Sequence, residues 1–391
     1  MASAGKYLLL DRFAVGGMAE IFRAKSMGIA GFEKIVAIKR ILPALALDEG
    51  FVQMFVEEAK IAGRLRHANI VPILELGKME DVHFIAMEYV SGKDLKQIFK
   101  ELNLLGQRMT PPMAAWIAVQ VLAGLDYAHR ARGSDGRSLR LIHRDVSPQN
   151  LLLSFGGEVK VIDFGLAKAE NRASQTQNGV VKGKLAYLSP EQAHGKRVDR
   201  RSDLFSLGIC AWEMLTGKRA FKRVDDRETV LAIREGKVDR LSQHVEVPPA
   251  LERIVMRALA RDRRRRYRTA LEIREDLDRY ARTAGLRFGR SALRALMRKN
   301  FPERFAGEPV DAISLVNPKK RQRKRRQNRI ESRPQFVPVD TISDTVDTLD
   351  VEAEFKLDDT TWDEGMATEP RLEPPAGDTQ PNVIVPEERE P

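Results

Sequence analysis

The sequence predicts an α+β fold, with a small β-rich lobe, a larger helical lobe and then a tail without regular structure. Short β-rich runs fill residues 7–90, and long segments with helical apolar periodicity follow up to about residue 300. From residue 330 onward, proline, threonine and acidic residues dominate without apolar periodicity, which is typical of disorder. Because 43% of the residues are hydrophobic and 31% are charged, the rest of the chain can form a full core, and a wholly disordered protein is excluded.

The first lobe is expected to be a sheet with one helix. Its strands are predicted at residues 7–10, 21–25, 35–41, 71–77 and 83–89. Between the third and the fourth, apolar side chains recur at helical spacing over residues 48–66, and Asp48 is placed to cap that helix.

The second lobe contains two long apolar segments, residues 111–130 and 202–216, which are expected to be helices. Residues 157–163 have a short strand pattern in which Val159, Val161 and Asp163 share one face. Cys210, the single cysteine, falls on the second helix, which predicts a buried core thiol and excludes an internal disulfide.

The charge is divided unevenly along the chain. Residues 331–391 carry 17 acidic and 4 basic side chains, so residues 1–330 carry a net charge of +24. A basic run at residues 318–329 joins the two parts; it could bind nucleic acid, an anionic membrane surface or the acidic tail, or be a solvated linker. Because it has no interleaved aromatic residues, we expect no specific nucleic-acid partner.

The sequence has no apolar run of about 18 residues, so no membrane span is expected. The first residues lack the apolar stretch of a signal peptide, and we expect a cytoplasmic protein. Together these patterns predict four parts, at residues 1–90, 91–300, 301–329 and 330–391.

Two charged residues occupy positions where apolar side chains are expected. Glu58 lies on the apolar stripe of the helix at 48–66, and Lys39 shares a strand face with Ile35, Ala37 and Ile41. A buried charge needs a partner, so we expect Lys39 and Glu58 to form an ion pair. The alternative is that each side chain reaches solvent at the edge of its element.

Three motifs add chemistry to this pair. The sequence AVGGMAEI at 14–21 is a glycine-containing turn between strands, which can bring backbone N–H groups against phosphates. Downstream stand HRDVSPQN at 143–150 and DFG at 163–165. A strand lysine, a helix glutamate, H-R-D-x-x-x-x-N and D-F-G in this order are highly specific, and residues 7–285 resemble the eukaryotic-like (Hanks-type) bacterial serine/threonine protein kinases, notably cytosolic kinases of myxobacterial type.

This resemblance implies a bilobal protein-kinase fold and transfer of the γ-phosphoryl group of ATP to serine or threonine hydroxyls of protein substrates, with autophosphorylation. It implies that the turn covers the phosphates, Met87 is the gatekeeper before the hinge, and Asp94 binds the ribose. The residues implied to bind the nucleotide are Ala14, Val15, Gly16, Gly17, Ile21, Ala37, Lys39, Met87, Glu88, Val90 and Asp94.

The resemblance also implies the catalytic roles. Asp145 would accept the substrate proton, Glu58 would orient Lys39, and Asn150 and Asp163 would hold Mg²⁺ or Mn²⁺. Two structural roles are implied as well. An ion pair between Glu191 and Arg266 would stabilise the substrate platform, and Asp203 would hold the backbone of the catalytic loop.

The sequence departs from the family pattern at two places. Ala14 and Ala19 replace glycines in the phosphate turn, where alanine disfavours positive φ. Ser147 stands where serine/threonine kinases carry a lysine, and Lys184 stands where they carry a threonine. We expect that Lys184 reaches the transferred phosphoryl group in place of the missing lysine; the alternative is drift at two tolerant positions.

Two other functions are alternatives. The departures from the family pattern favour a nucleotide-binding pseudokinase that acts as a scaffold through its tail. The net positive charge of residues 1–330 favours a nucleic-acid-binding protein. Phosphorylation of Ser174 or Thr176 could order the activation segment through Arg144. A phosphothreonine-binding partner is expected for the tail, at Thr341 or Thr360.

Overall fold

The computed structural model of the chain describes residues 3–4, 6–133, 135–164, 185–221, 223–286 and 288–305. Contacts divide the chain into two units, Met1–Val310 and Asp311–Pro391. The described residues all belong to the first unit. The predicted basic linker and acidic tail fall largely or wholly outside them, and so do Lys184, Ser174 and Thr176. The four predicted parts therefore stay a prediction.

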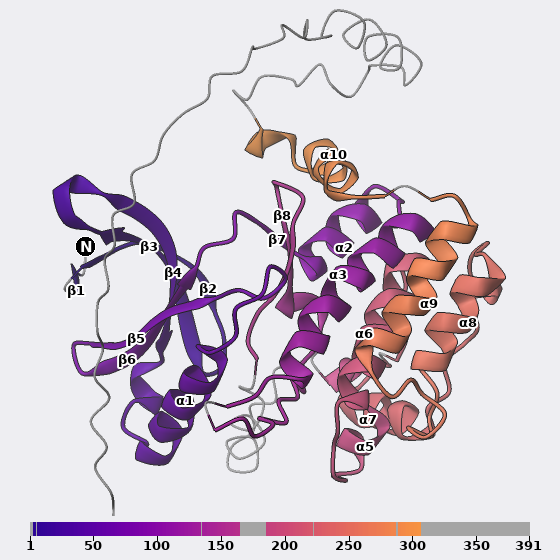
Figure 1. The fold of residues 1–391 in the computed structure, drawn as a ribbon, viewed down its shortest axis with the longest axis horizontal. Helices are drawn as coiled ribbons and strands as arrows, with labels where there is room; N and C mark the ends of the chain where they lie inside the picture. Colours follow the sequence, from indigo (N-terminus) through magenta and orange to yellow (C-terminus); the bar gives the residue numbers. More distant parts are fainter. Residues whose placement is uncertain are drawn as a thin grey trace, which may run out of the picture. The chain divides into compact units, whose positions relative to one another are not determined.

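The β-rich lobe is a sheet whose neighbouring strands all pair antiparallel, in the order β1-β2-β3-β4-β6-β5 (Figure 1). The strands are β1 (Ser3–Ala4), β2 (Tyr7–Val15), β3 (Ala19–Met27), β4 (Glu33–Ile41), β5 (Ile73–Met79) and β6 (Val82–Glu88). Each of the five predicted runs overlaps a strand of this sheet.

One helix, α1 (Glu49–Ala62), packs against this sheet, as predicted. Asp48 caps it, since its Oδ1 accepts a hydrogen bond from the Phe51 N–H at 3.0 Å. Phe51 and Phe55 of α1 form a buried cluster with Ile41 of β4 and Ile85 of β6, which fixes the helix on the sheet.

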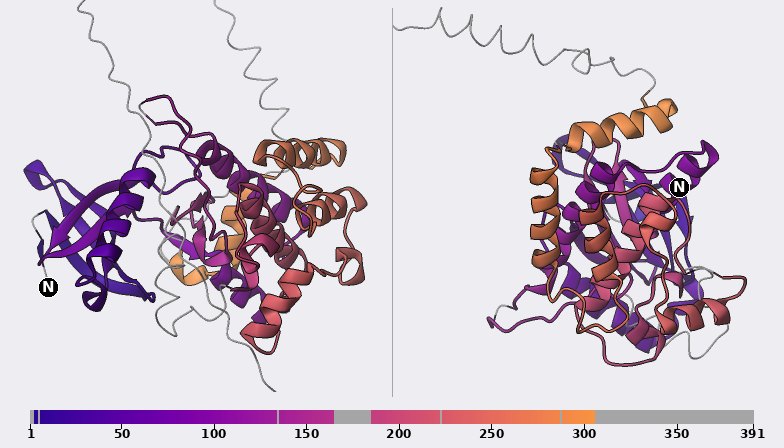
Figure 2. Two further views of the ribbon diagram at one scale, coloured as in Figure 1. Left: turned by 90° about the horizontal axis from the view of Figure 1, so that it is seen from below. Right: turned by 90° about the vertical axis from the view of Figure 1, so that its right-hand side faces the viewer.

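The second lobe is mainly helical (Figure 2), as predicted. Its helices are α2 (Leu95–Leu104), α3 (Pro111–His129), α5 (Pro190–Ala193), α6 (Arg201–Thr216), α7 (Asp226–Glu235), α8 (Pro249–Ala258), α9 (Ala270–Thr283) and α10 (Arg290–Asn300). Among the described residues, no helix is long and apolar enough to cross a membrane.

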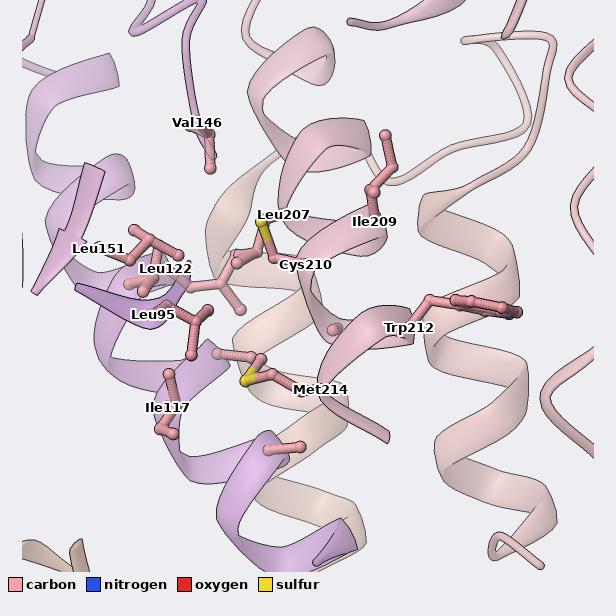
Figure 3. Packing of buried hydrophobic residues seen from close by; sticks show 14 of the residues in the cluster. Leu95, Ile117, Leu122, Val146, Leu151, Leu207, Ile209, Cys210, Trp212 and Met214 are labelled. Atoms are coloured by element: carbon pink, nitrogen blue, oxygen red, sulfur yellow. The ribbon is translucent and has the colours of Figure 1, made fainter. Parts of the chain in front are cut away.

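Helix α6 lies inside this lobe, since every residue from Ser202 to Thr216 is buried. Leu207, Ile209 and Met214 of α6 lie in one buried cluster with Leu122 of α3 (Figure 3). Cys210 belongs to the same cluster and is fully buried, and burial raises the pKa of its thiol well above the usual value. This confirms the prediction of a core thiol.

A small antiparallel sheet lies in the helical lobe, in the order β7-β8-β9, made of β7 (Gly92–Asp94), β8 (Leu151–Ser154) and β9 (Val159–Val161). The strand predicted at 157–163 is wrong at its C-terminal end. Asp163 has a φ of 60°, which cannot continue an extended strand, so it does not share the face of Val159 and Val161.

The register of the small sheet brings three predicted site residues to one of its ends. Asp94 ends β7 and pairs with Leu152, Asn150 precedes β8, and Asp163 follows β9. Because Leu151 pairs with Val161, the start of β8 lies beside the end of β9. Asp94, Asn150 and Asp163, from distant parts of the chain, therefore meet at the same sheet edge.

Candidate active site

Lys39 of β4 forms an ion pair with Asp163. The distance from Lys39 Nζ to Asp163 Oδ1 is 2.8 Å, and the two side chains are 12% and 24% exposed. This pair joins the β-rich lobe to the segment that follows β9. The side chain of Glu58 lies outside the described residues, so the expected Lys39–Glu58 pair stays a prediction.

Asn150 hydrogen-bonds both to Asp145 in its own loop and to the segment just before Asp163. Its Nδ2 donates hydrogen bonds to the backbone oxygen of Asp145 at 2.7 Å and to the Asp145 carboxylate at 2.8 Å. Its backbone oxygen accepts a bond from the N–H of Ile162 at 3.0 Å, one residue before Asp163. The structure thus brings Asp145, Asn150 and Asp163 together, and through Asp163 it adds Lys39.

Asp203, near the start of α6, supports this loop from inside the core. Its carboxylate accepts hydrogen bonds from the backbone N–H groups of His143 at 2.9 Å and Arg144 at 2.7 Å, which confirms the prediction. Its Oδ2 also lies 2.7 Å from Nε2 of His129, a partner that sequence reasoning missed. Burial alone would raise the pKa of Asp203, but His129 and the N–H donors more than offset it and hold that pKa below its usual 3.8.

The turn predicted to cover the phosphates is a tight hairpin between β2 and β3. The N–H of Gly16 donates to the oxygen of Ala19 at 2.8 Å, which closes the turn. Ala14 and Ala19 lie within the two strands, and neither has a positive φ. The conformational objection to alanine at these two positions therefore does not apply.

Three residues predicted to bind the nucleotide share one face of the sheet with Lys39. Ile21 pairs directly with Lys39, and Ala37, two residues from Lys39, pairs with Met87. Met87, Lys39 and Asp163 also line a cavity of about 30 Å³.

The predicted hinge leads from β6 to β7. Glu88 accepts a bond from Lys160 Nζ of β9 at 2.9 Å, and Val90 is half-buried. Asp94 caps α2, where its Oδ1 accepts the Gln97 N–H at 2.8 Å. Burial raises the pKa of Asp94.

Ser147, which replaces the expected lysine, is 1% exposed, and its hydroxyl has no hydrogen-bond partner among the described residues. A buried hydroxyl that makes no hydrogen bond lowers the stability of the folded protein. Within the described part of the chain, Ser147 therefore lacks the hydrogen bond that buried hydroxyls usually make. Its proposed counterpart Lys184 lies outside that part, so the exchange remains a prediction.

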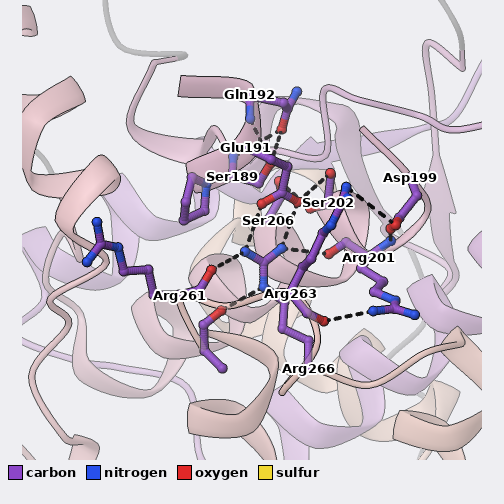
Figure 4. A network of polar contacts seen from close by, with 12 residues as sticks. Ser189, Glu191, Gln192, Asp199, Arg201, Ser202, Ser206, Arg261, Arg263 and Arg266 are labelled. Atoms are coloured by element: carbon purple, nitrogen blue, oxygen red, sulfur yellow. Dashed lines mark hydrogen bonds and ion pairs between the residues drawn. The ribbon is translucent and has the colours of Figure 1, made fainter. Parts of the chain in front are cut away.

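Glu191 and Arg266 form a buried ion pair, as predicted (Figure 4). Arg266 donates from Nη1 and Nη2 to the two carboxylate oxygens of Glu191, each at 2.8 Å. Beside it, Gln192 donates to the backbone oxygen of Arg144 at 2.9 Å, a link that the sequence does not reveal. Helix α5 is thereby connected to the segment at 143–150.

Comparisons with known proteins agree with this arrangement. The family model for the protein kinase domain matches residues 14–276. The chain is 40% identical over 300 residues to the tyrosine-protein kinase MasK of Myxococcus xanthus, covering 76% of this chain and 46% of that protein. It is 36% identical over 281 residues to the serine/threonine-protein kinase PknB of Mycolicibacterium smegmatis, covering 70% of this chain and 42% of that protein.

A solved structure shows the same fold. The kinase domain of PknI from Mycobacterium tuberculosis aligns with a TM-score of 0.54 and 26% identity, covering 72% of this chain and 96% of that domain. The chain spans less than half the length of the two curated relatives named above. By the match to the domain model and by its fold, the chain belongs to the protein kinase family.

Proposed function

We propose that this chain transfers the γ-phosphoryl group of ATP to serine and threonine hydroxyls of proteins. The observation that carries the proposal is the convergence of Lys39, Asp163, Asn150 and Asp145 through contacts of 2.7 to 3.0 Å. Phosphoryl transfer depends mainly on positioning and on electrostatic stabilisation, and these four side chains supply both. The same convergence counts against a pseudokinase.

The residues present fit a nucleotide with a hard divalent cation. Asn150 and Asp163 offer amide and carboxylate oxygens, which suit Mg²⁺ or Mn²⁺. No cluster of three or more His, Cys, Asp or Glu side chains in the described residues is placed to hold a metal by itself, which fits a cation that also needs phosphate ligands. Asn150 and Asp163 would hold the cation, and it would supply positive charge that offsets the negative charge developing during phosphoryl transfer.

In this proposal Lys39 holds the α- and β-phosphates, and Asp145 accepts the proton of the substrate hydroxyl. The Asn150 amide donates to Asp145 Oδ2, which fixes the plane of that carboxylate for the incoming hydroxyl. Ile21, Ala37 and Met87 contact the adenine, residues 88–90 read its edge, and Asp94 binds the ribose. The turn of Ala14, Val15, Gly16 and Gly17 covers the phosphates.

The acceptor hydroxyl is the finer part of the proposal. Several relatives are named serine/threonine-protein kinases, whereas MasK is named a tyrosine-protein kinase. The small buried Ser147 in place of a lysine leaves the family's serine/threonine marker missing, so tyrosine is the second candidate. Phosphoamino-acid analysis of the autophosphorylated chain separates them: we expect phosphoserine and phosphothreonine, and phosphotyrosine alone would support the second candidate.

The main test is the intact mass of the full chain after incubation with Mg²⁺ and ATP, beside the Asp145→Asn variant. We expect increments of one or more phosphates only in the wild type. If the wild type binds nucleotide without gaining mass, the pseudokinase alternative is supported instead. Peptide mapping then tests the predicted sites in the activation segment and tail, and Lys184→Ala with full turnover would remove the proposed role of Lys184.

Three further expectations remain proposals. Protein substrates follow from the family and from the Glu191–Arg266 platform. A phosphothreonine-binding partner of the tail and a cytoplasmic location rest on the sequence alone.

A further inference from the structure

The chain continues beyond the matched kinase domain with a packed segment, residues 288–305. It consists of α10 and a short 3-10 turn at Pro302–Arg304 (Figure 1). Leu293 and Met297 of α10 are fully buried in the main core, and Phe301 and Phe305 are 7% and 8% exposed. This extension is therefore an integral part of the helical lobe.

The extension packs against the end of the small sheet that contains the turn between β8 and β9. Arg290 Nε donates to the oxygen of Gly156 at 2.8 Å, and its Nη2 pairs with Glu158 at 3.0 Å. Gly157 has a φ of 82°, and a Cβ there would lie 2.1 Å from the backbone oxygen of Arg290. The turn between β8 and β9 thus fits α10 so closely that only glycine is tolerated.

Aromatic side chains of the extension also contact this end of the small sheet. Phe155, which directly follows β8, packs edge-on against Phe301 and Phe305, with ring centroids 6.2 and 5.5 Å apart. On the neighbouring strand, Lys93 Nζ lies 5.6 Å from the centre of the Phe301 ring. Phe301 therefore contacts both β7 and the residue after β8.

The end of the small sheet that the extension contacts is opposite the end that carries the site. At the contacted end, Gly92 pairs with Ser154, and the N–H of Phe155 donates to the oxygen of Ser91 at 2.8 Å. At the other end lie Asp94, Asn150 and Asp163. A strand of three or four residues is only about 10–13 Å long, so fixing one end fixes the position of the other.

We propose that residues 288–305 act as a brace that positions the nucleotide-binding end of the β7-β8-β9 sheet, with Phe301 as its main positioning residue. Phe301 acts on Asp94 indirectly, because it contacts Lys93, the residue that directly precedes Asp94. The proposal rests on the proposed function, because Asp94 is assigned there to the ribose. It extends the functional unit to Phe305, beyond the matched range that ends at residue 276.

The test compares the binding of ATP and of 2′,3′-dideoxy-ATP, with Mg²⁺, to the full chain. A hydrogen bond to a charged group contributes about 1.5–3 kcal/mol, so the wild type should prefer ATP by roughly tenfold or more. In Phe301→Ala we expect this preference to fall close to one because ATP binding weakens while dideoxy-ATP binding changes little. Phe301→Tyr, which keeps the ring, should retain the preference.

Phe288→Ala is the matched control. Phe288 belongs to the same extension but packs on Trp116 of α3, with ring centroids 6.0 Å apart, and not on the small sheet. Phe288→Ala should lower the melting temperature without changing the preference for ATP. If Phe301→Ala also lowers only the melting temperature, the extension is merely structural and the proposal is wrong.

A second readout separates this proposal from the assignment of Asp94. If the wild type itself does not distinguish the two nucleotides, the ribose role of Asp94 fails. The brace is then judged by the Mg²⁺ concentration that gives half-maximal ATP binding, since Asn150 and Asp163 lie at the same sheet end. A several-fold increase in Phe301→Ala supports the brace, and an unchanged value contradicts it.

Discussion

Replacing Glu191 by glutamine removes the carboxylate that pairs with Arg266 in the core of the helical lobe. The Arg266 side chain is 0% exposed and that of Glu191 is 7% exposed. Besides its two bonds to Glu191, Arg266 donates from Nε to the oxygen of Ala260 at 2.7 Å. The substituted amide can accept one bond from Arg266, but its NH₂ group faces a second donor, and the buried guanidinium loses its countercharge.

The expected cost follows from these contacts. Each hydrogen bond to a charged group contributes about 1.5–3 kcal/mol, and one of two is lost outright. Breaking a buried ion pair from one side costs about 3–5 kcal/mol, because the remaining charge stays desolvated. We therefore expect Glu191→Gln to lower the free energy of unfolding by about 3–5 kcal/mol. At about 2–4 °C per kcal/mol, the melting temperature should fall by roughly 6 °C or more.

Urea denaturation followed by circular dichroism measures this change. The control is Asp278→Asn, which breaks an exposed helical pair with Arg274 whose side chains are 41% and 46% exposed. That variant should lose no more than about 0.5 kcal/mol. The double variant Glu191→Gln with Arg266→Met should lose less than the sum of the two single variants, because it leaves no unpaired charge.

A loss of unfolding free energy below about 1 kcal/mol in Glu191→Gln, the range of a surface pair, would contradict this prediction. Additive effects of the two single substitutions would also contradict it, since the estimate depends on coupling between Glu191 and Arg266.

Three further predictions concern other parts of the fold. Asp203 has a folded-state pKa below its usual 3.8, so its stabilising effect is present above that pH and is lost as the pH falls through the folded value. The difference in unfolding free energy between wild type and Asp203→Asn should therefore be large at pH 7 and shrink toward pH 3; an equal difference at both would count against it. Cys210 should react with a thiol reagent at pH 8 only after unfolding, and rapid labelling of the native chain would show that it is accessible. Gly92→Ala should destabilise the protein and weaken ATP binding, because its Cβ would lie 2.2 Å from the oxygen of Leu153 and push β7 from β8; Gly289→Ala, with nothing within 4 Å, is the control.

Local patterns predict most of the fold correctly. The apolar spacing of α1, together with Asp48 before it, is a signal within a few residues, and the structure shows both the helix and its cap. The apolar segment at residues 202–216 likewise predicts a helix and the burial of Cys210, and the structure shows both. Signals of this kind depend on neighbours in sequence.

The rest depends on contacts between distant segments, which a pattern does not contain. Periodicity continues the strand of Val159 and Val161 to Asp163, but the strand ends at Val161 and Asp163 itself has a positive φ. The sequence predicts Glu58 as the partner of Lys39, whereas the pair of Lys39 with Asp163 spans 124 positions and has no local signal. The packing of Arg290 on Gly156 spans 134 positions, and nothing in either segment alone indicates it.

The place of the extension in the chain has a consequence for biosynthesis. Asp94, Asn150 and Asp163 are all made before the residues that hold their sheet, and roughly 140 residues separate Asp163 from Phe305. At about 5–20 residues per second, a ribosome needs roughly 7–30 s to synthesise that distance. During this interval the nascent chain carries the residues of the site without the aromatic contacts that fix them. If residues 288–305 brace the site as proposed, competence for phosphoryl transfer is delayed until the helical lobe is nearly complete.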